Sequence, residues 1–290
     1  MSKLAPNAPK IAVVGSINLD FVATAEKLPA PGETVTGATL ARHPGGKGAN
    51  QALAARRMGG RTTLCARVGR DAMADEAIML LMEGGVSLAG MTIDSEAPTG
   101  VALISVAKDG ENQIIVAPGA NARFAPELLT LPEADAVICQ LEIPMDTVMK
   151  AAEQAKGLFA VNLAPARPVP DRLLQRADLV IVNEGEAAFY NVNLARAGGL
   201  VATTFGRHGA SLVRGGQEIA RATPPKVTAV DTTGAGDAFV GALVVALAER
   251  QEPGQALMLA CAAGALAATR QGAQPSLPTR AEVEAILAGS

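Results

Sequence analysis

The sequence contains very few aromatic residues. Among its 290 residues it has no Trp, one Tyr and six Phe, although 49% of the chain is apolar. The core must therefore be built from Ala, Val, Leu and Ile, which is typical of parallel strands covered by helices on both faces. A chain of this length can form one large α/β domain with an added lobe, or two smaller domains.

The sequence lacks the residues that several classes of protein and binding site require. The two histidines, His43 and His208, lie far apart with no clustered Cys/His spacing, which argues against a structural zinc site. A net charge of −3 provides no basic field for nucleic acid or for a membrane surface. No run of 18 apolar residues occurs, and the N-terminus does not resemble a signal peptide. Because Cys65, Cys139 and Cys261 are isolated in apolar segments, we expect reduced thiols and a cytoplasmic protein.

Short apolar runs alternate with helical patterns along most of the chain. The predicted strands are residues 11–14, 63–68, 136–140, 158–163, 179–183 and 200–205. The predicted helices are residues 48–58, 72–82, 145–156, 238–250 and 256–269, with a final helix from residue 280. This alternation predicts an α/β fold with a doubly wound, mostly parallel sheet and helices on both faces.

Two segments break this alternation. Residues of about 18–42 contain strand-like runs, and residues of about 91–118 contain two more, joined by the hairpin signal Asp109-Gly110. We infer a small β-sheet built from these two excursions. Ligands of open α/β sheets bind beyond the carboxyl ends of the strands, so this small sheet could act as a lid there. Residues 1–290 are then expected to form one domain with a lid.

The most informative segment is residues 229–237, which leads directly into an apolar stretch. Gly234, Ala235 and Gly236 leave backbone N–H groups uncovered at a helix start, where the dipole is positive and an anion can bind. Asp237 adds a carboxylate in the first helical turn. A base beside an oxyanion site is what phosphoryl transfer to a hydroxyl requires. The alternative interpretation is a tight turn with a capping Asp.

Polar residues near the first strand and first helix predict a sugar site. Lys47 and Asn50 flank a glycine-rich helix start, including Gly46, which allows close backbone approach to a ligand. The spacing matches neither a Walker loop nor a dinucleotide fingerprint. Asn18 and Asp20 alternate with apolar residues, so both face one way and can hold adjacent hydroxyls. A solvated Lys and a surface acid remain alternatives.

Polar residues and glycines also follow three of the predicted strands. They are Glu142, Asn183, Glu186, Thr204, Gly206 and Gly209. These positions lie where α/β sites form. Asn183 and Glu186 could reach phosphates directly or through Mg²⁺-bound water, and Gly206 and Gly209 allow backbone contact with a nucleotide. His208 fits an exposed loop better than a catalytic base, and we assign His43 no role.

Taken together, these motifs resemble the ribokinase group within the PfkB family of carbohydrate kinases, over nearly the whole chain. Residues 45–50 and 231–237 resemble the wider family. The segments that favour the ribose-phosphorylating group are residues 15–20, 31–35, 99–104, 118–121, 162–166 and 272–276.

The resemblance implies a ribokinase-like fold and ATP-dependent phosphorylation of D-ribose at its 5-hydroxyl. It implies that Asp237 is the base and that Gly234, Ala235 and Gly236 form the anion hole. The implied ribose ligands are Asn18, Asp20, Gly46, Lys47, Asn50, Glu142 and Asp237. The implied residues around ATP and Mg²⁺ are Asn183, Glu186, Thr204, Gly206, Gly209 and Gly236. A monovalent cation, usually K⁺, would be held by Asp231, Thr233, Ala267, Arg270, Gly272 and Ser276.

The family is also commonly dimeric through its lid strands, so a homodimer is expected. Two alternatives stay open: a kinase for another furanose or a nucleoside (deoxyribose, fructose or adenosine), and a catalytically silent sugar-binding regulator. One departure is that only about 20 residues separate Asn183 from Thr204, which makes residues 191–200 short for a full crossover helix. Another is Gly185, where the family pattern has Thr.

Overall fold

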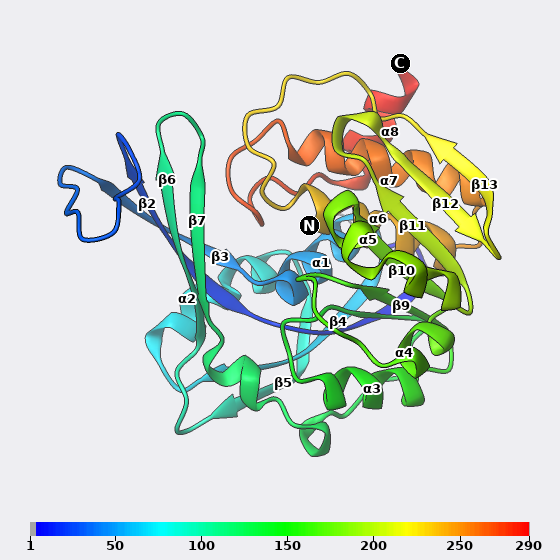
Figure 1. The fold of residues 1–290 in the computed structure, drawn as a ribbon. Helices are drawn as coiled ribbons and strands as arrows, with labels where there is room; N and C mark the ends of the chain where they lie inside the picture. Colours follow the sequence, from blue (N-terminus) through cyan, green and yellow to red (C-terminus); the bar gives the residue numbers. More distant parts are fainter. Residues whose placement is uncertain (1–3, 290) are drawn as a thin grey trace.

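The computed structural model describes residues 4–289, and its main feature is a large twisted sheet (Figure 1). Within those residues the sheet has nine strands in the order β13-β12-β11-β10-β9-β8-β1-β4-β5. Their bounds are β1 (Lys10–Val14), β4 (Arg61–Gly69), β5 (Ser87–Asp94), β8 (Ala136–Cys139), β9 (Leu158–Asn162), β10 (Leu179–Asn183), β11 (Leu200–Thr204), β12 (Ala210–Arg214) and β13 (Gln217–Ala222). The pairings from β5 to β11 are parallel, and β11–β12 and β12–β13 are antiparallel.

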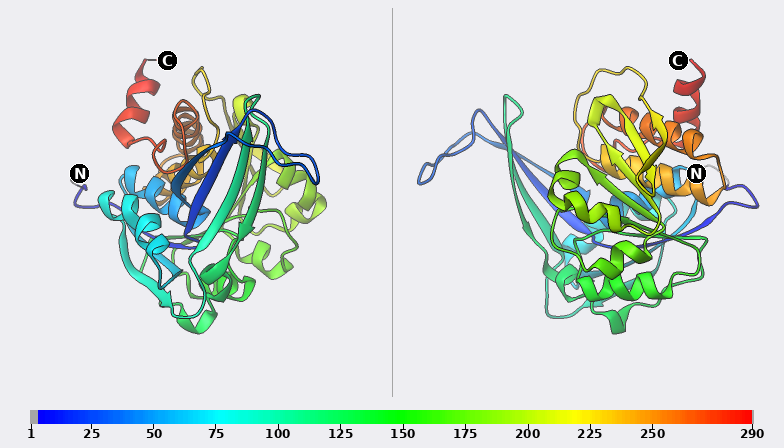
Figure 2. Two further views of the ribbon diagram at one scale, coloured as in Figure 1. Left: turned by 90° about the vertical axis from the view of Figure 1, so that its left-hand side faces the viewer. Right: turned by 45° about the vertical axis from the view of Figure 1, so that its right-hand side comes forward.

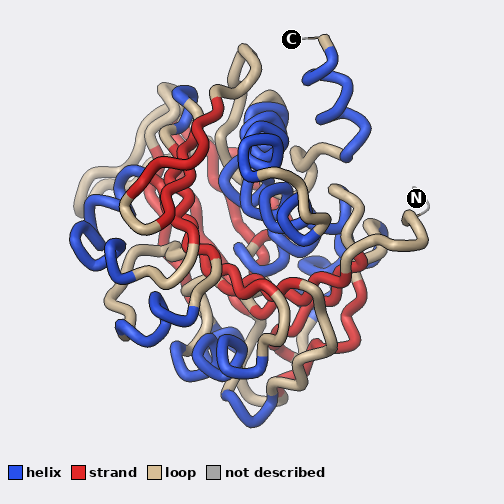
Figure 3. Tube along the Cα trace, turned by 90° about the vertical axis from the view of Figure 1, so that its right-hand side faces the viewer, coloured by secondary structure: helices blue, strands red, loops and turns tan. Residues whose placement is uncertain are grey.

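Both faces of the main sheet are apolar and covered by helices. In β1, Ile11 and Val13 belong to one core, and Ala12 and Val14 belong to the other. The first core is closed by α1 (Lys47–Arg57), α2 (Ala72–Glu83), α6 (Ala235–Ala248), α7 (Pro253–Ala267) and α8 (Arg280–Ala288). The second is closed by α3 (Met145–Gln154), α4 (Asp171–Arg176) and α5 (Glu184–Tyr190). Figure 3 shows helices on both sides of the strands, which confirms the predicted doubly wound architecture.

The antiparallel strands β12 and β13 were not expected from the sequence. They carry polar residues between apolar ones, so they lack the continuous apolar runs of the buried parallel strands. Gly215 and Gly216 connect them with positive φ angles of 56° and 80°. Two adjacent glycines in this conformation form the tight hairpin turns that match strand twist, and this was the available signal.

A second, four-stranded sheet projects from the body (Figure 2). Its order is β3-β2-β6-β7, with β2 (Asn18–Ala25), β3 (Thr39–Gly45), β6 (Gly100–Ala107) and β7 (Asn112–Ala117). The predicted excursion at 91–118 begins too early, because residues 91–94 pair with β4 in the main sheet as the end of β5. Local strand propensity does not reveal which sheet a strand joins.

The crossover between β10 and β11 is compact. The helix α5 is followed by a single 3₁₀ segment, η3 (Asn191–Arg196), in place of a second helical stretch. The shortness expected for residues 191–200 is therefore accommodated without breaking the parallel pairing of β10 with β11. In residues 4–289, every helix is too short or too polar to span a bilayer.

Candidate active site

The first turn of α1 lies directly against the start of β2. Gly46 caps α1 with a φ of 89°, and a Cβ at this position would lie 2.7 Å from the backbone N of Asn18. Only glycine combines this left-handed backbone with such a close approach. The contact places Asn18 and Asp20 of β2 near Lys47 of α1, so the structure brings the two predicted sugar-binding segments together.

Asp237 lies in the first turn of α6 and is 7% exposed. Its Oδ2 accepts a hydrogen bond from Asn50 Nδ2 at 2.9 Å, and its Oδ1 accepts one from Gln51 Nε2 at 2.9 Å. Burial raises the pKa of Asp237, while the nearby Lys47 ammonium and the two amide donors oppose that rise. The result is a desolvated carboxylate held in place by two side chains of α1.

Lys47 lies among four carboxyl groups. Burial alone would lower the pKa of its ammonium, but Asp237, Glu142, Glu186 and Asp20 raise the pKa above its usual value. Glu142 Oε2 accepts hydrogen bonds from the Lys47 backbone N at 3.0 Å and from Ser16 Oγ at 2.5 Å. Lys47 therefore stays charged and partly neutralises this acidic cluster.

The pKa of Asp20, a member of that cluster, is strongly raised. Burial, together with the nearby Glu142 and Asp237 carboxylates, raises the pKa of Asp20 from 3.8 to about 7, against the opposing effect of Lys47. A buried carboxyl group whose pKa is raised this far by its neighbours is typical of a functional site.

A cavity of about 200 Å³ lies beside Lys47 and Asp237 at the carboxyl ends of the central strands. It is lined by Lys47, Asn162, Ala164, Ile181, Val182, Asn183, Glu186, Thr204, Thr232, Gly234, Gly236, Asp237, Phe239 and Val240. Among the predicted nucleotide-side residues, Asn183, Glu186, Thr204 and Gly236 line it. Gly206 and Gly209 do not line it; they lie in the turn that follows β11.

Asn183 and Glu186 form a reciprocal cap at the start of α5. Asn183 Oδ1 accepts from the Glu186 N–H, and Glu186 Oε2 accepts from the Asn183 N–H, both at 2.8 Å. Burial raises the pKa of Glu186, although the Asn183 hydrogen bond and Lys47 oppose this. The cap fixes both side chains at the rim of the cavity.

The predicted anion-hole turn packs against the loop at 272–276. Gly234 has a φ of 78°, and a Cβ there would lie 3.0 Å from Ala273 Cα. The N–H of Ala235 donates to Thr232 O at 3.2 Å, so Ala235 would have to release this bond in order to bind an anion. The first N–H groups of a helix otherwise have no intrahelical partner.

The predicted cation-binding residues also gather behind this turn. Asp231 accepts hydrogen bonds from the N–H groups of Thr233 and Gly272, both at 2.9 Å. Burial alone would raise the pKa of Asp231, but these bonds lower it below its usual value. The Arg270 guanidinium, which pairs with Glu282 at 2.5 Å, is itself a cation without an acceptor atom, so only the Arg270 backbone carbonyl could bind a cation. Ser276 Oγ donates to Ala273 O at 2.7 Å.

This set of oxygen ligands fits a monovalent cation, which does not require several charged ligands. In the described residues, no group of three or more His, Cys, Asp or Glu side chains is arranged to hold a metal ion. The available oxygen ligands are one carboxylate, two hydroxyls and backbone carbonyls, and hard cations prefer such ligands.

Two buried amide residues of the site, and a third behind them, were assigned no role from the sequence. Gln51 contacts Asp237, Asn162 lines the cavity, and Gln140 donates to Gln51 from behind. Gln51 follows Lys47 by four residues and so shares its helix face, and Asn162 and Gln140 lie at the ends of predicted strands. These positions could be located from the sequence, but the hydrogen bond from Gln140 to Gln51 joins distant segments.

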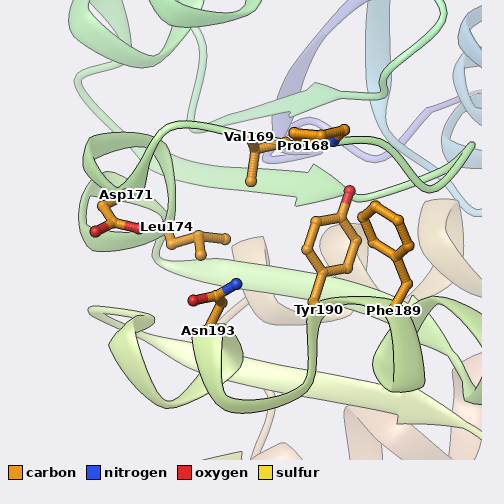
Figure 4. A pocket seen from close by; sticks show the side chains of 7 residues that line it. All are labelled: Pro168, Val169, Asp171, Leu174, Phe189, Tyr190 and Asn193. Atoms are coloured by element: carbon orange, nitrogen blue, oxygen red, sulfur yellow. The ribbon is translucent and has the colours of Figure 1, made fainter.

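A second cavity, of about 210 Å³, lies beside the compact crossover (Figure 4). It is lined by Pro168, Val169, Asp171, Leu174, Phe189, Tyr190 and Asn193. Tyr190 Oη donates to Arg167 O at 2.7 Å and accepts from the Arg167 N–H at 3.2 Å, so its polar end is satisfied. Within the described chain, residues 191–200 contribute to this second cavity and not to the one that holds Asp237.

Comparison with known proteins places this site in context. Residues 8–280 match the family described as pfkB family carbohydrate kinase. The chain is 36% identical to a ribokinase of Bacillus subtilis, over 96% of this chain and 99% of that protein. A ribokinase structure from Thermotoga maritima aligns with a TM-score of 0.89 at 36% identity, covering 97% and 99% of the two chains. An Arabidopsis thaliana ribokinase complexed with ribose and ATP aligns with a TM-score of 0.87 at 30% identity, also covering 97% and 99%.

Proposed function

This chain belongs to the pfkB family of carbohydrate kinases, and from that membership and its site we propose that it is a ribokinase. It transfers the γ-phosphoryl group of ATP to the 5-hydroxyl of D-ribose. The observation that carries the proposal is the buried Asp237 carboxylate, held by two amide donors at the glycine-rich start of α6. A desolvated carboxylate beside uncovered N–H groups can remove a hydroxyl proton next to a phosphoryl group.

Ribose would bind between the start of β2 and the start of α1. Asn50 Oδ1 is buried without a hydrogen-bond partner in the protein, although Asn50 Nδ2 is bonded to Asp237. A buried acceptor left unpaired is costly, and a sugar hydroxyl would satisfy it. Asp20 would accept from further hydroxyls, and Lys47 would donate to one. Asn18, Gly46 and Glu142 complete the proposed ribose-binding set.

In the proposed reaction, Asp237 takes the proton from the 5-hydroxyl as that oxygen attacks the γ-phosphorus. The bond between the γ-phosphorus and the bridging oxygen breaks, and ADP leaves. The N–H groups of Gly234, Ala235 and Gly236 would stabilise the charge on the transferring group. Burial raises the pKa of Asp237, which makes its carboxylate a stronger base toward the 5-hydroxyl.

The residues that would surround ATP and its metal lie at the carboxyl ends of β10 and β11, in the turn after β11 and in the first turn of α6. They are Asn183, Glu186, Thr204, Gly206, Gly209 and Gly236. When bound, Mg²⁺ would neutralise charge on the phosphates, and Asn183 and Glu186 would hold it directly or through water.

A monovalent cation, most simply K⁺, would be held behind the anion hole. Its ligands would be oxygens of Asp231, Thr233, Ala267, Arg270, Gly272 and Ser276. Because Ala273 of the same loop packs against Gly234, a cation there would order the turn that presents the anion-hole donors.

The test of this function is a substrate panel. Coupled assays of ATP consumption with ribose, deoxyribose, fructose and adenosine should give the highest kcat/KM with ribose. Activity should fall when a bulky organic cation replaces K⁺. A better rate with another acceptor would reassign the substrate. Ribose binding without ATP consumption would identify a sugar-binding regulator.

Replacing Asp20 with Asn should weaken ribose binding and stabilise the protein at alkaline pH. The carboxyl group titrates near 3.8 when unfolded and near 7 when folded, so the folded protein binds more protons between those values. Stability contributed by this group therefore falls as the pH rises through that window. At pH 8 we expect Asp20→Asn to raise the free energy of unfolding by about 1–3 kcal/mol. The difference between the folded and unfolded pKa values corresponds to an upper limit of roughly 4 kcal/mol. The expected gain is smaller because solvent screens a half-buried group.

Urea denaturation at pH 5 and pH 8 measures this effect, and the gain should be smaller at pH 5. The ribose KM is measured on the same samples. An unchanged KM would contradict the role of Asp20 in sugar binding, whatever the stability result.

A homodimer through the small sheet is proposed from its exposed apolar side chains. These are Leu40, Leu103, Ile114, Ile115 and Val116, all between 48% and 67% exposed. The strand β7 is exposed along its whole length and forms an open edge. A single-layer sheet with apolar residues on both faces needs a cover, and a second copy of the chain provides a matching one.

Ile115→Lys should convert this dimer to a monomer, because it places a charge in the centre of the apolar surface. Sedimentation velocity measures the change. Ile219→Lys is the matched control, since Ile219 is 42% exposed on the β13 edge of the other sheet. A monomeric wild-type protein, or dissociation by both substitutions, would contradict the proposed interface.

A further inference from the structure

Behind the proposed base lies a chain of fully buried amides. Gln51 is 0% exposed, and its Nε2 donates to both Asp237 Oδ1 at 2.9 Å and Asn162 Oδ1 at 3.0 Å. Its Oε1 accepts from Gln140 Nε2 at 2.6 Å. Gln140 is also 0% exposed, and its Oε1 has no partner in the protein. Both donors of Gln51 are therefore committed, one of them to the base.

The direction of these hydrogen bonds is fixed by the backbone. Asn162 Nδ2 donates to the carbonyl of Ile181 at 3.1 Å, and a carbonyl can only accept. Asn162 must therefore turn its Oδ1 toward Gln51, and Gln51 must donate a hydrogen bond to it from Nε2. A reversed Gln51 would place its Oε1 against the acceptors of Asn162 and Asp237. The backbone of β10 thus determines that a donor faces Asp237.

Gln51 and Asn50 both contact Asp237, but their positions differ. Asn50 has an unpaired Oδ1 in the site and is assigned above to the sugar. Gln51 has no exposed surface, so it can act on the reaction only through Asp237. One amide donor on each carboxylate oxygen fixes the plane of the carboxylate, and Gln51 is the donor that substrate does not engage.

The charged groups facing Asp237 come from four separate segments. Lys47 of α1 favours the ionised carboxylate, whereas Glu142 after β8, Asp20 of β2 and Glu186 of α5 disfavour it. The Lys47 ammonium and the hydrogen bonds from Asn50 and Gln51 therefore favour the ionised carboxylate against burial and these acidic neighbours.

We propose that Gln51 is a positioning residue that holds and orients the Asp237 carboxylate for proton transfer, with its own amide fixed by Asn162. This inference rests on the proposed role of Asp237 as the base. Gln51 supplies a donor to the ionised form and withholds any acceptor, so it favours the deprotonated state in one fixed plane.

Three variants separate this role from simple packing. Gln51→Met removes the donor at similar volume, and Gln51→Glu keeps the shape but replaces the donor with a carboxyl group. Gln140→Met is the matched control, because it cuts the same buried network while the Asn162 contact still orients Gln51. For each we would measure kcat and KM against pH, thermal stability, and the Asp237 titration by carboxyl ¹³C NMR.

Gln51→Met should lower kcat about 10- to 100-fold, with the KM values for ribose and ATP within about threefold, because only the base is misaligned. In the plot of kcat against pH, the limb on the acidic side should move to higher pH, and so should the titration of Asp237. Both shifts should be larger in Gln51→Glu than in Gln51→Met. Gln140→Met should be less stable than the wild type, but its kcat should stay within about threefold of the wild-type value and the acidic limb of its pH profile should not move.

Equal losses of kcat in Gln51→Met and Gln140→Met would overturn the proposal. An acidic limb of the kcat–pH profile that does not move in Gln51→Met would also overturn it, as would a Gln51→Glu protein that does not fold. Ratios to wild type are taken on whichever sugar the wild type phosphorylates best, so a wrong ribose assignment leaves the test intact. If the wild type phosphorylates no sugar, the proposed function fails, while the NMR titration still shows whether Gln51 controls the Asp237 carboxyl group.

Discussion

Asp237→Asn is expected to lower kcat by about 10² to 10⁴, the usual contribution of a general base, with little change in the ribose KM. The substitution keeps the size of the side chain and its place in the first turn of α6. It removes the one group in the site that is desolvated, anchored by two donors and adjacent to the glycine-rich turn. The loss should fall on kcat because the proton moves only in the transition state.

The fold should survive this change because Asn50 can adapt. An amide at position 237 presents an NH₂ donor group in place of one carboxylate oxygen, and Gln51 cannot reverse to accept a hydrogen bond from it. Asn50 can, because its Oδ1 has no other partner in the protein. The new amide therefore turns its donor toward Asn50 and leaves the buried network intact.

Asp94→Asn is the matched control for the loss of a buried acid. Asp94 is 1% exposed and pairs with Arg67 at 3.0 Å and Arg123 at 2.9 Å, at the end of the edge strand β5. This variant should lower Tm and leave kcat unchanged. Near wild-type turnover in Asp237→Asn, measured by the same coupled assay, would reject Asp237 as the base.

The fold could be predicted from the sequence because its buried strands are short and apolar. The strand at 136–139 is buried at every position, and an apolar run of this length between helical patterns has few other interpretations. The Gly215-Gly216 turn was a local signal for the β12–β13 hairpin, but the pairing of β12 with β11 and the sheet membership of residues 91–94 were not predictable in the same way. Both depend on which strands pair, and pairing is a property of distant contacts rather than of local sequence.

The site could be predicted in part because sheet topology gathers strand ends. Asn183 and Glu186 follow one strand, Thr204 ends its neighbour, and the structure brings all three to one cavity with Asp237. Gln140 illustrates the limit of that reasoning. Its amide matters through a hydrogen bond to a residue 89 positions earlier in the chain, and no spacing rule encodes such a contact.

Gly234→Ala is expected to lower kcat by about 10² to 10³, the range measured for removal of one oxyanion donor. Gly234 has a φ of 78°, where an L side chain is strained, and its new Cβ would lie 3.0 Å from Ala273 Cα and 3.1 Å from Ala273 O. The turn must therefore shift by a few tenths of an ångström. Anion-hole donors lose their alignment over such distances, so kcat should fall while ribose binding persists.

Gly216→Ala separates the loss of alignment from the cost of the backbone conformation. Gly216 has a φ of 80°, almost the same as Gly234, but it lies in the β12–β13 turn with nothing within 4 Å of a Cβ. Both substitutions should cost about 1–2 kcal/mol of stability, because both place a side chain in the left-handed region. Only Gly234→Ala should also raise the K⁺ concentration needed for half-maximal activity, since Ala273 belongs to the proposed cation loop. If the two variants lose equal stability and both keep wild-type kcat, the N–H groups at 234–236 do not stabilise the transferring phosphoryl group.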